Sequence, residues 1–79
     1  MRIRLRFFAS LRERLGPGDD RAVAPGSTPA SLWASVIAEH PDLRRTRVRF
    51  AVNERYVEPS ERLADGDELA VFPPVSGGA

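Results

Sequence analysis

One amphipathic helix, set among strand-like runs, limits what this chain can fold into more than any other feature. Thr28 can cap the free backbone N–H groups of a helix, and Pro29 suits the first helical position. Four apolar residues then recur at three- and four-residue spacings and form one face: Leu32, Trp33, Val36 and Ile37. The helix is expected to end near His40, because Pro41 follows. Such a stripe is suited to packing on a sheet, so we expect Trp33 and Ile37 to be buried against one.

The first strand is predicted at residues 2–8, where apolar and basic side chains alternate with a period of two. One face carries Ile3, Leu5 and Phe7. The opposite face carries Arg2, Arg4, Arg6 and Phe8. Phe8 is the exception on this face, because it is an aromatic residue among arginines. About two helical turns follow over residues 9–15, and a turn is expected at residues 16–20.

Four more strands complete the predicted sheet, at residues 21–24, 48–53, 56–57 and 68–72. In the run 48–53, alternation places three side chains inward: Val48, Phe50 and Val52. In the last strand, Leu69 and Val71 share one face, and Glu68, Ala70 and Phe72 share the other. Turns are expected at 53–55 and 65–67. Residues 59–63 are interpreted as a polar crossing with one short helical turn.

The order of elements is strand, short helix, strand, long helix and three strands. One helix lying across a mixed sheet of about five strands is a β-grasp, or ubiquitin-like, arrangement of the α+β class. A small open barrel of the OB type is the alternative, but the long helix is too central for it. The 79 residues suit one domain, which we place at residues 1–72, with an extended flexible tail at 73–79.

The tail has a composition that packs poorly but threads well. Two prolines end the last strand and favour an extended exit. A Gly-Gly pair has a large ordering entropy and buries nothing, so it stabilises a terminus poorly. A chain without Cβ atoms can instead pass through a narrow channel. The seven tail residues reach roughly 20 Å when extended, which is enough to enter the active site of another protein.

Bulk composition excludes several classes of function. The net charge of +1 argues against a protein held to nucleic acid by charge, although residues 44–49 form a short basic segment. There are no cysteines, and we expect neither a disulfide nor a metal site. No apolar run has the length of a membrane span, and the N-terminus has no signal-peptide pattern. We therefore expect a soluble cytoplasmic protein that binds neither nucleic acid nor membrane.

The sequence carries no self-contained active site. It has no paired carboxylates near a histidine, no nucleophile elbow and no Gly-rich phosphate loop after a strand. The lone histidine, His40, is interpreted as structural, since no partner for acid–base chemistry is visible. Any reaction would use the C-terminal carboxylate, activated for instance as a mixed anhydride with AMP. An activated glycine can accept a nucleophile such as sulfur, so the protein would be a substrate and not an enzyme by itself.

The end of the chain resembles that of a known family. The motif is Phe72-Pro73-Pro74-Val75-Ser76-Gly77-Gly78, with residues 65–69 before it. It resembles the signature end of the small subunit of molybdopterin synthase, the MoaD-like sulfur carriers. Residues 7–13 resemble the opening of that family, and residues 51–53 resemble its middle strand. The resemblance therefore covers nearly the whole chain.

This resemblance implies a function in sulfur transfer. In that family the terminal glycine is adenylated by an ATP-dependent activating enzyme and converted to a thiocarboxylate, with sulfur from a cysteine desulfurase or a rhodanese-like donor. The tail then inserts into the large synthase subunit, where its sulfur builds the dithiolene of molybdopterin. Gly78 would bear the sulfur here, and Gly77 would be the slender neck behind it. No bound cofactor is implied, because ATP is used by the activating enzyme.

One departure from the family pattern is Ala79, which follows Gly78 and gives it an amide where a free carboxylate is needed. Either a peptidase removes Ala79, or Ala79 is not native to the chain, or the protein is not a carrier in this form. Two other functions also stay open. One is a carrier for thiamin thiazole, cysteine or tRNA thiolation, and the other is a ubiquitin-like binding module that uses only a sheet face.

Strand parity predicts a docking surface at the root of the tail. Phe8 and Phe72 are out of phase with the inward residues of their strands, so both should lie on the face away from the helix. Tyr56 could join them. If the first and last strands are neighbours, the rings form one apolar patch with a rim of outward arginines: Arg4, Arg6 and Arg49. These residues, with Pro73, Pro74 and Val75 of the tail, are expected to bind the partners.

Overall fold

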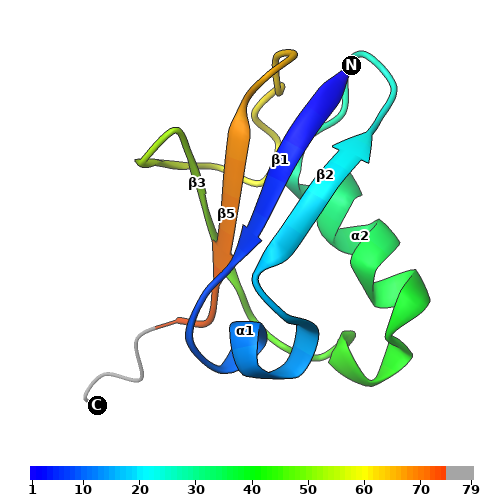
Figure 1. Cartoon of the computed structure of the whole chain (residues 1–79), viewed down its shortest axis with the longest axis vertical. Helices are drawn as coiled ribbons and strands as arrows, with labels where there is room; N and C mark the ends of the chain where they lie inside the picture. Colours follow the sequence, from blue (N-terminus) through cyan, green and yellow to red (C-terminus); the bar gives the residue numbers. More distant parts are fainter. Residues whose placement is uncertain (75–79) are drawn as a thin grey trace.

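The chain forms one five-stranded sheet with a long helix packed across it (Figure 1). The computed structural model describes residues 1–74. Its elements are, in order, β1 (Arg2–Phe7), α1 (Ala9–Leu15), β2 (Gly18–Ala22), α2 (Pro29–Glu39), the 3-10 helix η1 (Pro41–Leu43), β3 (Arg49–Val52), β4 (Arg55–Val57) and β5 (Glu68–Phe72). The predicted tail lies outside the described residues from position 75 onward, so the division into body and tail stays a prediction.

The strand order in the sheet is β2-β1-β5-β3-β4. β1 and β5 are parallel neighbours with Leu5 opposite Leu69, and the other neighbouring pairs are antiparallel. α2 covers one face of the sheet (Figure 1), and side chains on the other face, such as Arg4 and Tyr56, are exposed. A mixed sheet with parallel first and last strands and one crossing helix is the β-grasp, or ubiquitin-like, fold. The predicted fold class and element order are therefore confirmed.

α2 begins at Pro29 after the predicted Thr28 cap, and Ser31 completes a capping box that the sequence analysis did not include. The Ser31 backbone N–H donates to Thr28 Oγ1 at 3.1 Å, and the Thr28 N–H donates to Ser31 Oγ at 2.9 Å. Trp33 is buried, with 8% of its surface exposed. Ile37 is only half-buried, because it follows Val36 by about 100° around the helix and lies at the margin of the stripe. The predicted burial is thus right for Trp33 and only partly met for Ile37.

The core fills the space between α2 and the inward face of the sheet. Thirteen buried side chains form it: Ile3, Leu5, Phe7, Leu11, Leu32, Trp33, Val36, Leu43, Phe50, Val52, Leu63, Leu69 and Val71. The alternation predicted in β1 and β5 is confirmed. In β3, Phe50 and Val52 are buried as predicted, but Ala51 between them is buried too, and Val48 is only half-buried because β3 begins at Arg49.

β2 begins earlier than predicted. Residues 16–20 were assigned to a turn, but β2 starts at Gly18 and pairs with β1 from there, with Gly18 opposite Arg6. Gly18 has a φ of 121°, and a Cβ at this position would collide with the carbonyl oxygen of Leu5. The glycine that suggested a turn therefore allows two strands to approach closely.

The crossing between β4 and β5 also differs from the prediction. Residues 59–60 form a turn and no helical turn is present among residues 59–63. Leu63 is buried, and its N–H donates to the carbonyl oxygen of Ser27 at 2.9 Å. Burial of the Leu63 side chain thus anchors residues 59–63 to the core, although most residues of this segment are polar. Leu43 of η1 is likewise buried, and it anchors the charged segment that follows α2 to the core.

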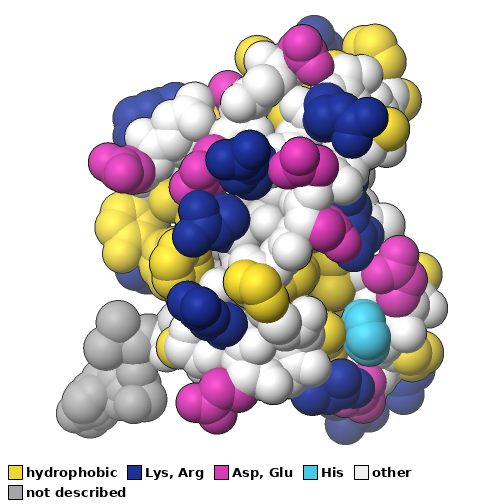
Figure 2. Space-filling model, viewed as in Figure 1, with side chains coloured by type: hydrophobic (Ala, Val, Ile, Leu, Met, Phe, Trp, Pro, Cys, Tyr) yellow, Lys and Arg dark blue, Asp and Glu magenta, His cyan; other side chains and the backbone are white. Residues whose placement is uncertain are grey.

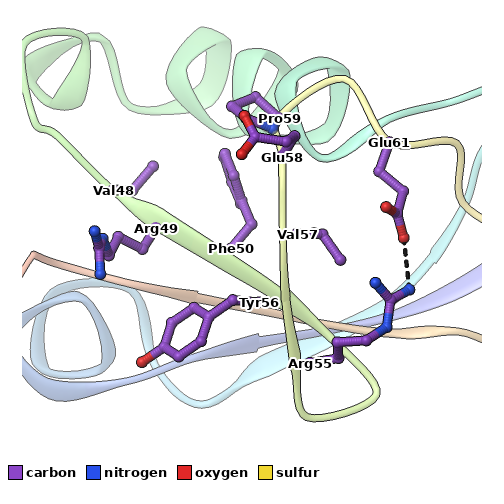
Figure 3. Close-up of a pocket in the computed structure, with 9 residues that line it drawn as sticks. All are labelled: Val48, Arg49, Phe50, Arg55, Tyr56, Val57, Glu58, Pro59 and Glu61. Carbon is purple, nitrogen blue, oxygen red and sulfur yellow. Dashed lines mark hydrogen bonds and ion pairs between the residues drawn. The ribbon is translucent and has the colours of Figure 1, made fainter.

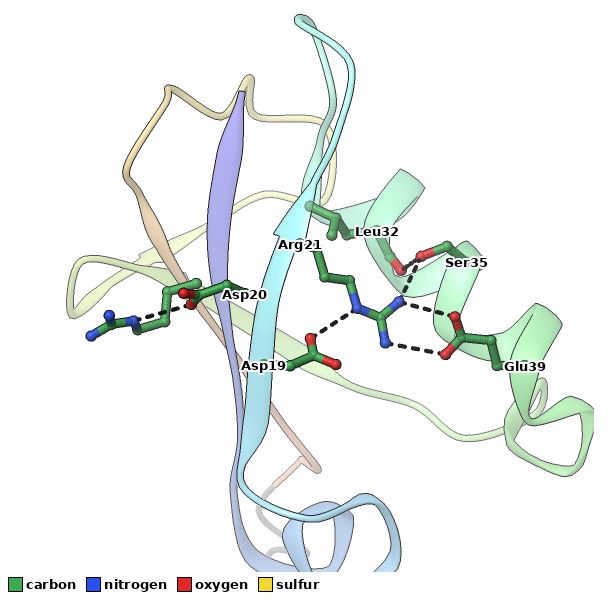
Figure 4. A network of polar contacts seen from close by, with 7 residues as sticks. Asp19, Asp20, Arg21, Leu32, Ser35 and Glu39 are labelled. Carbon is green, nitrogen blue, oxygen red and sulfur yellow. Dashed lines mark hydrogen bonds and ion pairs between the residues drawn. The ribbon is translucent and has the colours of Figure 1, made fainter.

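Two groups of ion pairs join elements of the body. Arg21 on β2 donates to Asp19 at 3.0 Å and to Glu39 of α2 at 3.1 Å (Figure 4). Burial lowers the pKa of Arg21, but the bonds to Asp19 and Glu39 outweigh it, so its pKa is raised. Arg14 of α1 donates to Asp42 of η1 at 2.9 and 3.0 Å, and these bonds lower the pKa of Asp42. Within residues 1–74, no helix has the length and apolar character needed to cross a lipid bilayer.

Candidate functional site

Three aromatic rings from separate parts of the chain meet on the sheet face opposite α2. The Phe8 and Phe72 ring centroids lie 6.4 Å apart, and those of Tyr56 and Phe72 lie 5.5 Å apart. Both pairs meet edge to face, the arrangement that aromatic quadrupoles favour. Phe8 is 36% exposed and Tyr56 is 66% exposed. We call Phe8, Tyr56 and Phe72 the aromatic patch. The structure thus brings together Phe8 and Phe72, which strand parity placed on this face, and it adds Tyr56 to them.

The end of β1 places Phe8 beside the last strand. The Phe8 N–H donates to the carbonyl oxygen of Val71 at 3.2 Å, which extends the parallel pairing by one residue. Phe8 has an extended conformation, with φ −131° and ψ 159°, and occupies the N-cap position of α1 without a side-chain capping bond. Ala9 then has a φ of 53°, a left-handed conformation that is rare for alanine. The chain turns sharply here, so Phe8 stays on the open face while α1 leaves the sheet.

A tight hairpin brings Tyr56 to the same face. Asn53 and Glu54 connect β3 to β4, with φ values of 50° and 70°. Two successive positive values are typical of the type I′ turn that matches the twist of a hairpin. The register places Ala51 opposite Tyr56 on one side and opposite Ala70 on the other. Ala51 is only 7% exposed although it lies on the open face, which the sequence analysis did not predict.

Two of the three predicted rim arginines contact the aromatic patch. The Arg6 guanidinium lies 5.9 Å from the Phe8 ring centroid, and the Arg49 guanidinium lies 5.9 Å from that of Tyr56. Both distances suit a cation–π interaction. Arg4 is on the same face but pairs with Asp20 of β2, with the Arg4 Nε atom 3.4 Å from the carboxylate. Arg4 therefore pairs with the edge strand β2 and is not part of the rim around the rings.

A groove crosses the open face next to the aromatic patch. Its lining combines rings, alanines and carboxylates: Phe8, Ala9, Glu54, Glu68, Ala70, Phe72 and Pro73. Figure 2 shows the hydrophobic side chains gathered over this part of the molecule, with acidic and basic side chains along one side. The sequence analysis missed Glu54 and Ala70 as members of a site, because only the register of β3, β4 and β5 brings them together.

A second hollow lies at the β3–β4 edge (Figure 3). Its lining includes Phe50, Tyr56 and Pro59, and the Arg55–Glu61 ion pair closes one end with a 2.8 Å contact. Tyr56 and Phe50 point to opposite sides of the strand pair in this view. Tyr56 thus separates the second hollow from the aromatic patch.

The described part of the predicted tail is short. Pro73 is half-buried against the body and lines the groove, whereas Pro74 is exposed. Val75, Gly77 and Gly78 lie outside the described residues, so their predicted parts in binding and chemistry are untested. Within residues 1–74, no three His, Cys, Asp or Glu side chains are grouped to hold a metal ion.

Comparison with known protein families shows to which family the chain is related. The model of the ThiS family matches residues 5–78, from the middle of β1 through the Gly-Gly pair. The chain belongs to the ThiS family. All three residues of the aromatic patch lie within the matched region of this ThiS-family protein.

Relatives of this ThiS-family protein are similar over most or all of their length. A protein of Chlamydomonas reinhardtii named molybdopterin synthase sulfur carrier subunit is 40% identical, over 99% of this chain and 100% of that one. The protein of the same name from Homo sapiens is 37% identical, over 91% of this chain and 89% of its own. A Haloferax volcanii protein of known solution structure superposes with a TM-score of 0.84 at 33% identity, covering 99% of this chain and 87% of that one.

Proposed function

We propose that this protein is a sulfur carrier that supplies sulfur for molybdopterin synthesis as the small subunit of molybdopterin synthase. The observation that carries this proposal is the aromatic patch at the root of a tail that contains Gly77-Gly78, in a chain of the ThiS family. The names of the relatives, which are similar over 89% to 100% of their own length, support it.

The reactive group is the carboxylate of Gly78 once that residue is terminal. One of its oxygens bonds to the α-phosphorus of ATP on the activating enzyme, and pyrophosphate leaves. The terminal sulfur of a persulfide on the sulfur donor then attacks the acyl carbon and AMP leaves, which gives an acyl disulfide. A thiolate attacks the donor-side sulfur and cleaves the S–S bond, so the Gly78 thiocarboxylate leaves and the donor sulfur ends in a disulfide with that thiol. Gly77 has no Cβ, which lets the tail pass through a narrow channel to the active site of the large subunit. The small subunit then supplies sulfur, and the large subunit supplies the catalytic side chains.

The aromatic patch is the docking surface of this proposal. Its rings offer an apolar centre, while Arg6 and Arg49 offer a polar margin, the arrangement typical of a binding hot spot. β5 ends in Phe72 and leads directly into Pro73 and Pro74. A partner that binds the rings would therefore also position the start of the tail. Val75 is the next tail residue in the proposed path to the channel of the large subunit.

Three partners follow from this function: the large synthase subunit, the ATP-dependent activating enzyme, and a cysteine desulfurase or rhodanese-like sulfur donor. The same surface would serve the first two, because both must hold the tail at its root. A location in the cytoplasm is part of this proposal.

The deciding experiment is intact-mass analysis after incubation with the activating enzyme, ATP and a sulfur donor. Two chains are compared, one ending at Gly78 and one at Ala79. We expect a mass gain equal to the replacement of oxygen by sulfur in the chain ending at Gly78 only. If neither chain changes mass, the protein is not a sulfur carrier.

The pathway is tested separately. Thiocarboxylated protein is mixed with the large synthase subunit of the source organism and the pterin precursor, and molybdopterin is measured. A thiocarboxylate that forms but yields no molybdopterin would mean a carrier for thiamin thiazole, cysteine or tRNA thiolation. A ubiquitin-like binding module would instead keep its affinity for partners after deletion of residues 77–79.

A further inference from the structure

The groove beside the aromatic patch is apolar at one end and acidic at the other. Phe72, Ala70 and Glu68 alternate along β5, so all three side chains lie on the open face in that order. Glu54 joins Glu68 at the acidic end from the β3–β4 turn, and Phe8 joins Phe72 at the apolar end. Ala70 lies between the two ends and leaves room above the sheet.

The two carboxylates at the acidic end, Glu54 and Glu68, have no strong ion pair within residues 1–74. Among residues 1–74, Glu68 pairs only with Arg6, at 3.8 Å, and both side chains are more than a third exposed. Ion pairs of this kind are weak and exchange partners readily. Glu54 is exposed and forms no ion pair within the same residues. The backbone of Glu68 is nevertheless fixed, because its N–H donates to Asn53 Oδ1 at 3.0 Å.

The apolar end suits the stem of a long side chain, and the faces of its rings attract cations. Lysine and arginine combine an apolar stem with a charged head, and they bury the stem while the head meets a polar group. A purely aliphatic side chain in the groove would strip water from the carboxylates without replacing it. An acidic side chain would be repelled by Glu54 and Glu68.

We propose that the groove receives a long cationic side chain of the partner protein, with arginine favoured over lysine. Its stem lies over Ala70 beside the rings of Phe8 and Phe72, and its charge meets Glu54 and Glu68. Arginine is favoured because its planar guanidinium matches carboxylates in a bidentate fashion and stacks on rings. The inference rests on the proposed function, since it names the chemistry that a carrier's partner presents to this surface.

The test uses the full chain and the large synthase subunit of the source organism, with binding measured by calorimetry at about 50 and about 200 mM salt. The variant Glu54→Gln/Glu68→Gln removes both charges from the groove and keeps the side-chain shapes. Its matched control, Glu13→Gln/Glu58→Gln, makes the same change in net charge at exposed positions outside the groove. We expect about tenfold weaker binding and a smaller salt dependence for the groove variant. The control should stay within about twofold.

A second variant tests the space over Ala70. Ala70→Leu should fill the groove and weaken binding, while the melting temperature of the free protein reports whether the sheet is intact. A double-mutant cycle then combines Glu54→Gln with replacement of each interface arginine or lysine of the large subunit by glutamine. One partner cation should show strong coupling with Glu54, and all others should be additive.

Two outcomes would overturn the inference. In the first, the groove variant binds as tightly as the parent with the same salt dependence. In the second, Ala70→Leu weakens binding while the glutamine variants have no effect, which would mean that an apolar side chain fills the groove. Phe72→Ala distinguishes these failures from failure of the carrier function. If it weakens binding and the Gly78 thiocarboxylate still forms in the parent chain, the proposed function stands without the cation.

Discussion

The rings of Phe72 and Tyr56 meet edge to face, with their centroids 5.5 Å apart. Phe72 ends the central strand β5, and Tyr56 belongs to the edge strand β4. β3 lies between these two strands, with Ala51 opposite Tyr56 and Arg49 opposite Phe72, so the rings meet diagonally across β3. The residue just before the prolines is therefore held by the edge of the sheet, and the start of the tail is fixed to the body.

Phe72→Ala should weaken binding to both the activating enzyme and the large synthase subunit. Phe72 contacts both other rings of the aromatic patch, so its loss removes the centre of the surface. We expect a loss of about 2 kcal/mol or more in binding free energy, measured by calorimetry. Phe8→Ala should act in the same direction. Unchanged affinity in both variants would leave the tail as the only recognition element.

Trp33→Ala should act on stability and not on docking. Trp33 is 8% exposed and lies in the core on the opposite side of the sheet from the aromatic patch. Truncation of a buried tryptophan destabilises by about 3–5 kcal/mol, which is a large fraction of the stability of a domain this size. Chemical denaturation gives the free energy of unfolding, and native fluorescence should be that of a water-shielded indole. A strongly quenched native fluorescence would contradict this burial.

The sequence predicted most of the body because its signals are local. The Thr28–Ser31 cap, the Leu32 to Val36 stripe and the alternation of β1 and β5 each depend on a few neighbouring residues. The start of β2 was missed because Gly18 and its aspartates have the composition of a turn. Pairing with β1 overrides that local preference.

The candidate site was only partly predictable. Parity placed Phe8 and Phe72 on one face, and the β-grasp fold required the first and last strands to be neighbours, which the structure confirms for β1 and β5. The groove is different, since Glu54 and Ala70 are adjacent only through the register of three strands. The two-residue turn at 53–54 fixes the register of β3 with β4, but the register of β3 with β5 comes from long-range pairing that no local spacing encodes.

Gly18→Ala should destabilise the fold much more than Gly26→Ala. Both glycines have positive φ, so both substitutions introduce backbone strain. A Cβ at Gly26 meets no atom, whereas a Cβ at Gly18 would collide with the backbone of Leu5 in β1. We expect Gly18→Ala to cost about 2 kcal/mol more than its control, because β1 and β2 must separate. Thermal denaturation of the two variants measures the difference. Equal losses of stability would mean that β1 and β2 can accommodate the added Cβ without loss of free energy.

Asn53→Ala should loosen the corner that carries Glu54 and Glu68. The Asn53 Nδ2 atom donates to Asp67 Oδ1 at 3.0 Å, and Asn53 Oδ1 accepts from the Glu68 N–H at 3.0 Å. Asn53 also has a φ of 50°, which asparagine tolerates better than alanine. Loss of two hydrogen bonds and added strain should together cost about 2 kcal/mol in the free energy of unfolding. Asn53→Gly is the control, since it removes the same hydrogen bonds without the strain and should cost less.

Gly77→Leu should block sulfur transfer without unfolding the body or abolishing docking. Residue 77 follows the aromatic patch by five positions and belongs to the part of the chain proposed to enter the channel of the large subunit. A branched side chain there adds bulk behind Gly78, and the substitution leaves the core described within residues 1–74 unchanged in sequence. We therefore expect an unchanged melting temperature, binding to the large subunit reduced far less than in Phe72→Ala, and molybdopterin formation near background. Gly77→Ala is the matched control and should keep part of the activity, because its one methyl group adds much less width. Full turnover by Gly77→Leu would show that no narrow channel receives the tail, and the carrier would then have to present its sulfur at an open site.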